Sequence, residues 1–165
     1  MKEKILNRLR RQCSRREYCS SDILKKAAEA LEGDREGAKE ILDVLVSEKY
    51  VDDFRYASAY AREKAMISGW GEAKIRYVLS GKGIEHELIA RALEEIDDDK
   101  AEARLERLLD NRYRALKDDP QVRMKLLRFA LGRGYKYDEV ASAMESIIRK
   151  DEWIQTPHDG GNSDA

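Results

Sequence analysis

Proline is nearly absent from this chain of 165 residues, in which only Pro120 and Pro157 occur. Proline interrupts a helix because it lacks an amide hydrogen and its ring clashes with the preceding turn. Apolar residues recur at spacings of three and four along the chain, and the strict alternation typical of a half-buried strand is missing. The sequence therefore predicts an all-α protein of about nine helices.

Cysteine and histidine are also scarce, with Cys13, Cys19, His86 and His158 as the full set. Two cysteines exclude a disulfide framework, and two distant histidines provide no zinc-ligand spacing. Cys13 falls on the apolar face of the first predicted helix, where a small buried side chain is expected. We expect no metal site and no other cofactor.

Long apolar runs are missing as well. No segment reaches the roughly 18 apolar residues that a membrane-spanning helix requires. The opening segment MKEKILNRLRRQ lacks the apolar stretch of a signal peptide. We expect a cytoplasmic protein that makes no membrane contact.

Motifs of catalysis do not occur. The sequence contains no GxxxxGK[ST] phosphate loop, no HExxH and no nucleophile elbow. The adjacent acids Asp52 with Asp53, and those at 97–99, stand at predicted helix starts, where carboxylates cap free amides and favour the positive end of the helix dipole. We expect no catalytic residue and no enzymatic activity.

Polar residues and glycines mark the helix boundaries. Helix starts are predicted at Ser20 or Ser21, at Asp34, at Asp52, and at Asp119 followed by Pro120. Helix ends are predicted at Gly33, at Gly69, at Gly81 with Gly83, and at Gly132 with Gly134. The chain is thus divided into short helices, which need tertiary contacts to be stable.

The helices form a repeat. Nine positions between Ile75 and Ile96 each meet a similar residue 51 positions later, between Leu126 and Ile147. A weaker match at an offset of 52 relates the N-terminal segment to the middle one. We therefore predict three tandem three-helix modules, at 1–49, 50–97 and 98–150, forming an elongated, curved repeat protein, with a frayed tail at 151–165.

Trp70 stands between the long and the short helix of the middle module, and Tyr18 occupies the matching place in the first. A large aromatic side chain at such a junction favours a role in filling the core. The alternative is an exposed anchor for a partner.

Basic residues are the best candidates for a binding surface, although the net charge is only −1. In the first predicted helix Lys4, Arg8, Arg11 and Arg15 fall on one face, opposite the apolar residues. Such a stripe is expected of a protein that binds phosphates or an acidic surface, and the alternative is a merely solvated face. Six further candidates lie on the short helices of the other modules or beside them: Lys74, Arg76, Lys82, Arg123, Lys125 and Arg128.

A DNA-reading helix-turn-helix is a weaker interpretation of the same pattern. Base readout uses donors such as Arg or Asn at the start of the recognition helix. The third helices of the modules begin instead with acids, Glu85 with Glu87 and Asp138 with Glu139. Phosphates would be repelled there.

Residues 50–84, YVDDFRYASAYAREKAMISGWGEAKIRYVLSGKGI, resemble the core signature of the regulatory protein RecX family. The shared sequence elements are, in this order, a tyrosine with DD shortly after it, RYA, a GWG turn and a final KGI. The resemblance, with its helical modules, extends over residues 1 to about 150. The third module departs most, because Gln121 stands where Trp70 would be.

This resemblance implies a non-enzymatic modulator of the RecA recombinase. Such a protein lies in the groove of the RecA filament on single-stranded DNA and limits filament extension, strand exchange and coprotease activity. The alternative is a helical protein that binds DNA phosphates directly and acts without RecA. We expect a monomer in either case, and the family supplies no invariant active site to transfer.

Overall fold

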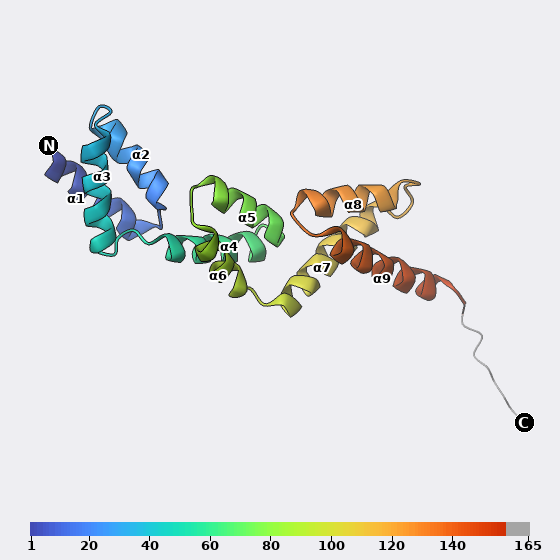
Figure 1. Ribbon diagram of the computed structural model, residues 1–165. Coiled ribbons are helices and arrows are strands. Elements are labelled where there is room, and N and C mark those ends of the chain that lie inside the picture. The colour runs from blue at the N-terminus through green and yellow to red at the C-terminus, as the bar shows by residue number, and fades with distance from the viewer. Residues whose placement is uncertain (158–165) are drawn as a thin grey trace, which may run out of the picture. The chain divides into compact units, whose positions relative to one another are not determined.

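The computed structural model describes residues 1–157, which contain α-helices and no strand (Figure 1). The nine helices of this part are α1 (Lys2–Arg15), α2 (Ser20–Ala30), α3 (Arg35–Ser47), α4 (Asp53–Met66), α5 (Glu72–Gly81), α6 (His86–Glu94), α7 (Asp98–Leu116), α8 (Val122–Gly132) and α9 (Tyr137–Gln155). The predicted all-α class is confirmed. None of these helices is long and apolar enough to cross a membrane.

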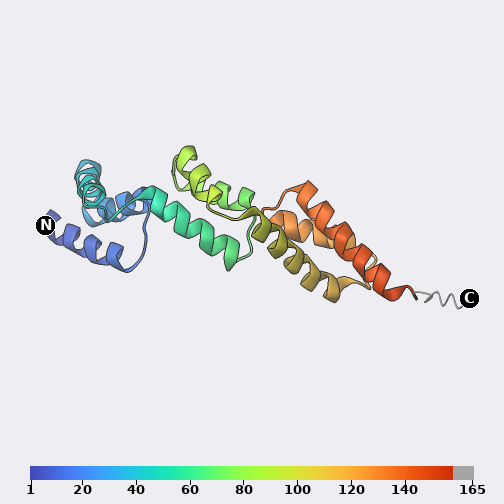
Figure 2. The same ribbon diagram turned by 90° about the horizontal axis from the view of Figure 1, so that it is seen from below.

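The chain divides into two compact units. Unit 1 is Met1–Asp97 and holds α1 to α6, whereas unit 2 is Asp98–Ala165 and holds α7 to α9. Within unit 1, α1 and α2 pack on α3, and α4 packs on α5 and α6. Within unit 2, α7 and α8 pack on α9, and Figure 2 shows α7 alongside α9. The helices therefore associate in threes, and the exact module boundaries stay a prediction.

Each group of three helices has its own apolar core. In the second and third groups, the paired positions Ile75 and Leu126 are fully buried, as are Leu79 and Ala130. These are the positions that the sequence repeat matches at an offset of 51. The repeat thus corresponds to a shared pattern of burial.

Contacts between the first two groups hold unit 1 together. The Ser20 amide donates a hydrogen bond to Asp53 Oδ1 (2.7 Å), and the Ser21 hydroxyl donates to the Lys82 carbonyl (2.6 Å). The Cys19 side chain is fully buried in the core of α4–α6 rather than in that of its own group. The segment entering α2 is therefore part of the interface with α4 and α5.

Two of the predicted caps are confirmed. Asp34 accepts a hydrogen bond from the Gly37 amide at the start of α3 (3.0 Å), and Asp52 accepts from the Arg55 amide at the start of α4 (3.0 Å). Each carboxylate satisfies an amide that has no partner within its own helix.

The start of α2 at Ser20 is confirmed, but its predicted serine cap is wrong, and so is the predicted start of α8 at Asp119. Neither serine caps α2, which begins at Ser20 after Cys19 and makes no side-chain cap bond. The Ser20 amide has Asp53, from another helix, as its acceptor instead. Helix α8 begins only at Val122, because the Asp119 carboxylate accepts from the Gln121 amide (2.8 Å) and closes a turn before the helix.

The predicted tail is wrong in its first part. Helix α9 continues to Gln155, so that residues 151–155 are helical. The Asp151 carboxylate accepts hydrogen bonds from the Tyr113 hydroxyl of α7 (2.8 Å) and from the Gln155 side chain (3.1 Å), and these contacts extend the helix. Residues 158–165 of the predicted tail, with His158, lie outside the described residues.

A glycine with positive φ closes the turn from α5 to α6. Gly83 has a φ of +76°, and Gly134 occupies the matching turn in unit 2 with a φ of +94°. An L side chain is disfavoured in this left-handed region. These glycines allow the sharp turn that brings the third helix of a group back onto the second.

We expect Gly83→Ala to lower the free energy of unfolding by about 1 to 2 kcal/mol, because alanine is strained at positive φ. Gly81 is the matched control, since it ends helix α5 and a Cβ there would meet no atom within 4 Å. Gly81→Ala should raise stability by about 0.5 to 1 kcal/mol. Urea unfolding followed by circular dichroism measures both, and equal effects of the two substitutions would contradict this account of the turn.

Candidate functional site

Helix α1 exposes a row of cations on its outer side. Its buried face contains Ile5, Leu6, Leu9 and Cys13, which pack against α2 and α3. The α1 stripe, defined as Lys4, Arg8, Arg11 and Arg15, is exposed on the opposite face. At 3.6 residues per turn the four positions lie within one narrow sector of the helix.

The four cations of the α1 stripe have no ion pair, hydrogen bond or ring contact with any described residue of the chain. The neighbouring cations of the same helix differ from them. Lys2 pairs with Glu40 of α3 (2.8 Å), and Arg10 pairs with Glu48 (2.6 Å), which directly follows α3. Charges on the flank of α1 therefore attach the helix to α3, while the stripe remains uncompensated.

Arg10 contacts Glu48 through two parallel hydrogen bonds, from Nε (2.8 Å) and from an Nη nitrogen (2.6 Å). The hydrogen bond from Arg10 lowers the pKa of the Glu48 carboxyl. This carboxylate is thus committed to its partner on α1. It does not neutralise the stripe.

A shallow hollow adjoins the stripe between α1 and α2. Its volume is about 340 Å³, and Arg8, Gln12, Lys26 and Glu29 are among the residues that line it. The Oε1 atom of Gln12 is buried and has no hydrogen-bond partner within residues 1–157. Arg8 therefore belongs both to the stripe and to a surface with further polar groups.

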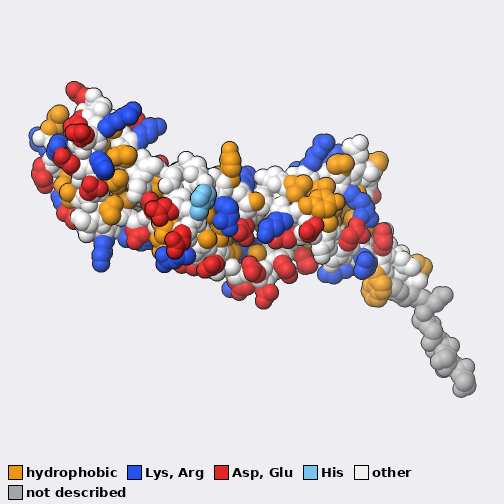
Figure 3. All heavy atoms as spheres, in the orientation of Figure 1, with side chains coloured by type: hydrophobic (Ala, Val, Ile, Leu, Met, Phe, Trp, Pro, Cys, Tyr) orange, Lys and Arg blue, Asp and Glu red, His pale blue; other side chains and the backbone are white. Residues whose placement is uncertain are grey.

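The six other basic candidates are mostly compensated. Five of them have a contact within the chain: Lys74 lies over the Trp70 ring (4.4 Å), Arg76 pairs with Glu72 (2.7 Å), Lys82 with Asp22 (3.6 Å), Arg123 with Glu145, and Lys125 with Asp119. Arg128 alone among the six is exposed without a partner in the described part of the chain. The space-filling view agrees, because basic and acidic side chains are mixed over most of the visible face (Figure 3).

The structure thus brings together four of the ten candidates, those of the α1 stripe. Lys74, Arg76 and Lys82 lie elsewhere in unit 1, on α5 and directly after it. The candidates on α8 belong to unit 2.

Trp70 packs against the core of α4–α6 and is half-buried, as predicted from its place in the sequence. Its ring meets Tyr60 edge to face, with centroids 6.3 Å apart, and Tyr60 stacks on Tyr56 at 5.9 Å. Lys64 lies 4.9 Å and Lys74 lies 4.4 Å from the centroid of the Trp70 ring.

The sequence reasoning missed that each group of helices carries an aromatic ring covered by two cations. Tyr18, the counterpart of Trp70, lies under Arg16 (4.4 Å) and Lys26 (5.3 Å). In unit 2 the ring is Phe129, under Arg112 (4.5 Å) and Arg133 (5.2 Å). Such contacts contribute about 0.5 to 1 kcal/mol each at exposed sites. In the sequence, the positions of Lys64 and Lys74 on either side of Trp70 could have indicated this contact.

The described residues offer little for nucleophilic or metal chemistry. Burial raises the pKa of the Cys13 and Cys19 thiols, which keeps them in the unreactive protonated form. No three His, Cys, Asp or Glu side chains within residues 1–157 are grouped as metal ligands. The arrangement is suited to binding through charge.

Two family models match this chain. The model described as "RecX, second three-helix domain" matches residues 52–93, and "RecX, third three-helix domain" matches residues 98–144. These ranges cover most of α4–α6 and of α7–α9. The match supports the three-helix group as the structural unit.

Among solved structures, the chain resembles a crystal structure of RecX from Lactobacillus salivarius. The TM-score is 0.79 at 21% identity, over 90% of this chain and 97% of the other. A second crystal structure, of a regulatory protein RecX, gives a TM-score of 0.76 at 24% identity, over 90% of this chain and 71% of the other. At these identities the likeness establishes the fold.

Several curated relatives are named regulatory protein RecX. The relative from Clostridium tetani is 28% identical over 122 residues, which are 72% of this chain and 56% of the relative. The chain spans about half the length of this and the other clostridial relatives. The relative from Chromohalobacter salexigens is 31% identical over 131 residues, which are 79% of this chain and 84% of the relative. With a relative of this identity and coverage, and with matched family models in both units, the chain belongs to the RecX family.

Proposed function

We propose that this chain is a non-enzymatic regulator of the RecA recombinase, which binds the RecA filament on single-stranded DNA and limits its extension. Strand exchange and coprotease activity would fall as a consequence, since both depend on the filament. The observation that carries the proposal is the relationship to the regulatory protein RecX of Chromohalobacter salexigens, over 84% of the length of that relative. We further propose that the protein acts as a cytoplasmic monomer.

The α1 stripe is the surface that we propose for this contact. Its four uncompensated cations suit a partner that presents carboxylates or phosphates. A filament of protein on single-stranded DNA offers both kinds of group. The other six candidates would take part only after exchanging their present partners, except Arg128.

We expect the protein to reduce RecA-catalysed ATP hydrolysis on single-stranded DNA when it is present at well under one copy per RecA subunit. A regulator that stops filament extension acts at few sites, so that a substoichiometric amount suffices. The assay is a titration of ATP hydrolysis at two salt concentrations. A full, unchanged rate at equimolar protein would contradict the proposal.

The second candidate function is direct DNA binding without RecA. The absence of acidic partners for the α1 stripe, within the described residues, also favours this reading. A protein that neutralises phosphates loses affinity steeply as salt rises, because counterions are no longer released into dilute solution. Tight, salt-sensitive binding to bare DNA, combined with unaltered ATP hydrolysis, would select this alternative.

A further inference from the structure

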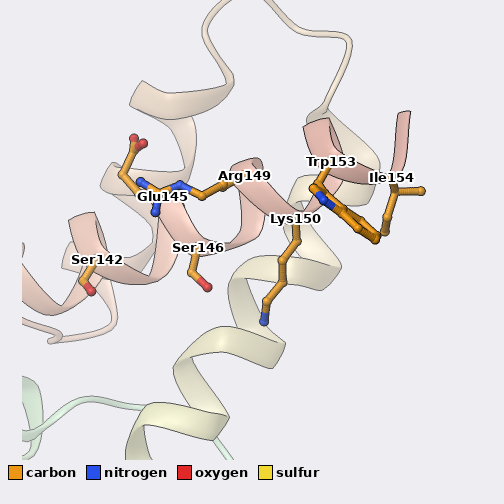
Figure 4. A pocket seen from close by; sticks show the side chains of 7 residues that line it. All are labelled: Ser142, Glu145, Ser146, Arg149, Lys150, Trp153 and Ile154. Atoms are coloured by element: carbon orange, nitrogen blue, oxygen red, sulfur yellow. The ribbon is translucent and has the colours of Figure 1, made fainter. Parts of the chain in front are cut away.

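Helix α9 of unit 2 has a largely exposed outer side. Seven residues recur along it at intervals of three and four: Ser142, Glu145, Ser146, Arg149, Lys150, Trp153 and Ile154 (Figure 4). We call them the outer α9 face. They line an open hollow of about 730 Å³. The opposite side of the helix is buried in the core of unit 2.

The C-terminal end of the outer α9 face is apolar. Trp153 is 65% exposed and Ile154 is 73% exposed. Both belong to the last helical turns, and Figure 3 shows hydrophobic side chains at the surface there. Exposed tryptophan next to a branched aliphatic side chain is typical of the apolar anchor of a protein interface.

The middle of the same face is basic. Arg149 and Lys150 make no ion pair with any described residue. Lys150 and Ile154 also line a second hollow, of about 530 Å³ between α7 and α9, to which Arg107 and Lys117 contribute further cations without partners in the described part. The two hollows therefore meet at Lys150 and Ile154.

The acids lining these hollows are largely neutralised within the unit. Glu145 pairs with Arg123, and Asp110 pairs with Arg114 (3.0 Å). The Asp151 carboxylate already accepts the Tyr113 hydroxyl. Among the described residues, Glu106 is the lining acid that is left without such a contact. The surface consequently has an excess of uncompensated positive charge around an apolar end.

We propose that the outer α9 face binds an acidic segment of a protein partner that also carries a large apolar side chain. The apolar side chain would pack on Trp153 and Ile154, and the carboxylates would meet Arg149 and Lys150. The small side chains of Ser142 and Ser146 leave room for the partner backbone to approach. The inference rests on the proposed function, and it identifies the surface by which unit 2 contacts the RecA filament.

A nucleic acid fits this face less well than a protein does. Glu106, Glu145 and Asp151 lie among the cations, and their carboxylates would repel a phosphate chain even where they are paired. The α1 stripe contains only cations, so it is the better phosphate-binding surface of the two. The outer α9 face combines charge with apolar area, as a protein interface does.

Substitution of Trp153 tests the proposal. We expect Trp153→Ala to weaken binding to RecA filaments by about tenfold or more, since a tryptophan anchor contributes disproportionately to affinity. Binding is measured by fluorescence anisotropy of the dye-labelled full chain, added to RecA filaments assembled on single-stranded DNA with a non-hydrolysable ATP analogue. Tyr137→Ala is the matched control, an aromatic residue of the same helix that is 61% exposed and lies 16 positions before Trp153. The control should bind as the parent does.

A charge variant, with Arg149 and Lys150 both replaced by glutamate, provides a second test that leaves the tryptophan in place. Circular dichroism verifies that each variant retains its helicity, and a bare oligonucleotide of the same sequence serves as the DNA probe. Loss of filament binding in both variants, with binding to the bare oligonucleotide unchanged, supports the proposal.

Three outcomes would overturn it. Parent-like filament binding by both variants removes this face from the interface and leaves the proposed function intact. A parallel loss of binding to the bare oligonucleotide shows that the face binds nucleic acid instead. Failure of the parent chain itself to bind RecA filaments ends the proposed function and this inference together.

Discussion

Replacing Arg8, Arg11 and Arg15 by glutamate is expected to weaken binding to RecA filaments on single-stranded DNA by about tenfold or more at low salt. The three residues lie on one exposed face of α1, and no described residue compensates their charge. Reversal turns attraction into repulsion for any partner that presents carboxylates or phosphates. The loss should shrink as salt rises, because exposed charges are screened.

Helicity should survive this change, since glutamate and arginine have similar helix propensities and the buried face of α1 is untouched. The matched control replaces the same three residues by lysine, which retains the charge and should bind within a few-fold of the parent. Anisotropy titrations of labelled protein at two salt concentrations give the affinities. If the glutamate variant binds as tightly as the parent, the α1 stripe is only a solvated surface.

Leu79→Ala should lower the free energy of unfolding by about 2 to 5 kcal/mol. The Leu79 side chain is fully buried between α4, α5 and α6, in a core that also contains Ile75 and Ile89. Truncation removes apolar burial and leaves a cavity that the short helix α5 cannot close without moving. Such a loss is a large fraction of the stability of a small domain.

Tyr77 provides the control, because it lies two residues earlier on α5 and is 80% exposed. Tyr77→Ala should change stability by no more than about 0.5 kcal/mol. Urea denaturation followed by circular dichroism gives both values from the same experiment. A neutral result for Leu79→Ala would mean that the face of α5 assigned to the core is the wrong one.

Sequence spacing was sufficient to predict which faces of the helices are buried. Ile75 and Leu79 are four residues apart and therefore point to the same side of α5. The caps by Asp34 and Asp52 were equally accessible, since the acceptor lies three residues from the amide that it satisfies. Features that depend on residues three or four positions apart can be predicted from the sequence.

Features that depend on distant residues could not be predicted in this way. The amide at the start of α2 bonds to Asp53, which is 33 positions away. The end of α9 is extended by the contact between Tyr113 and Asp151, which are 38 positions apart. Both arise from the packing of one helix on another, which periodicity within a helix does not reveal.

The candidate site shows the same limit. The sequence identified ten cations but not which of them are neutralised, because partners such as Glu145 for Arg123 lie on a different helix. The exposed end of α9 was missed for a related reason. Trp153 and Ile154 fall where the sequence loses its regular period, and only the continued helix places them on one face.

The burial of Cys19 in the core of α4–α6 shows that a unit of the sequence repeat is not the same as a unit of packing. In sequence, Cys19 lies well inside the first repeat, yet its side chain is buried in the core of the second, and the neighbouring Ser20 amide donates to Asp53 of the second. A fragment ending near residue 49 would expose this thiol to water and leave that amide without its acceptor. The repeat indicates duplication, but buried contacts join the first two groups within one compact unit. We therefore expect an insertion or truncation to be better tolerated after α6 than after α3.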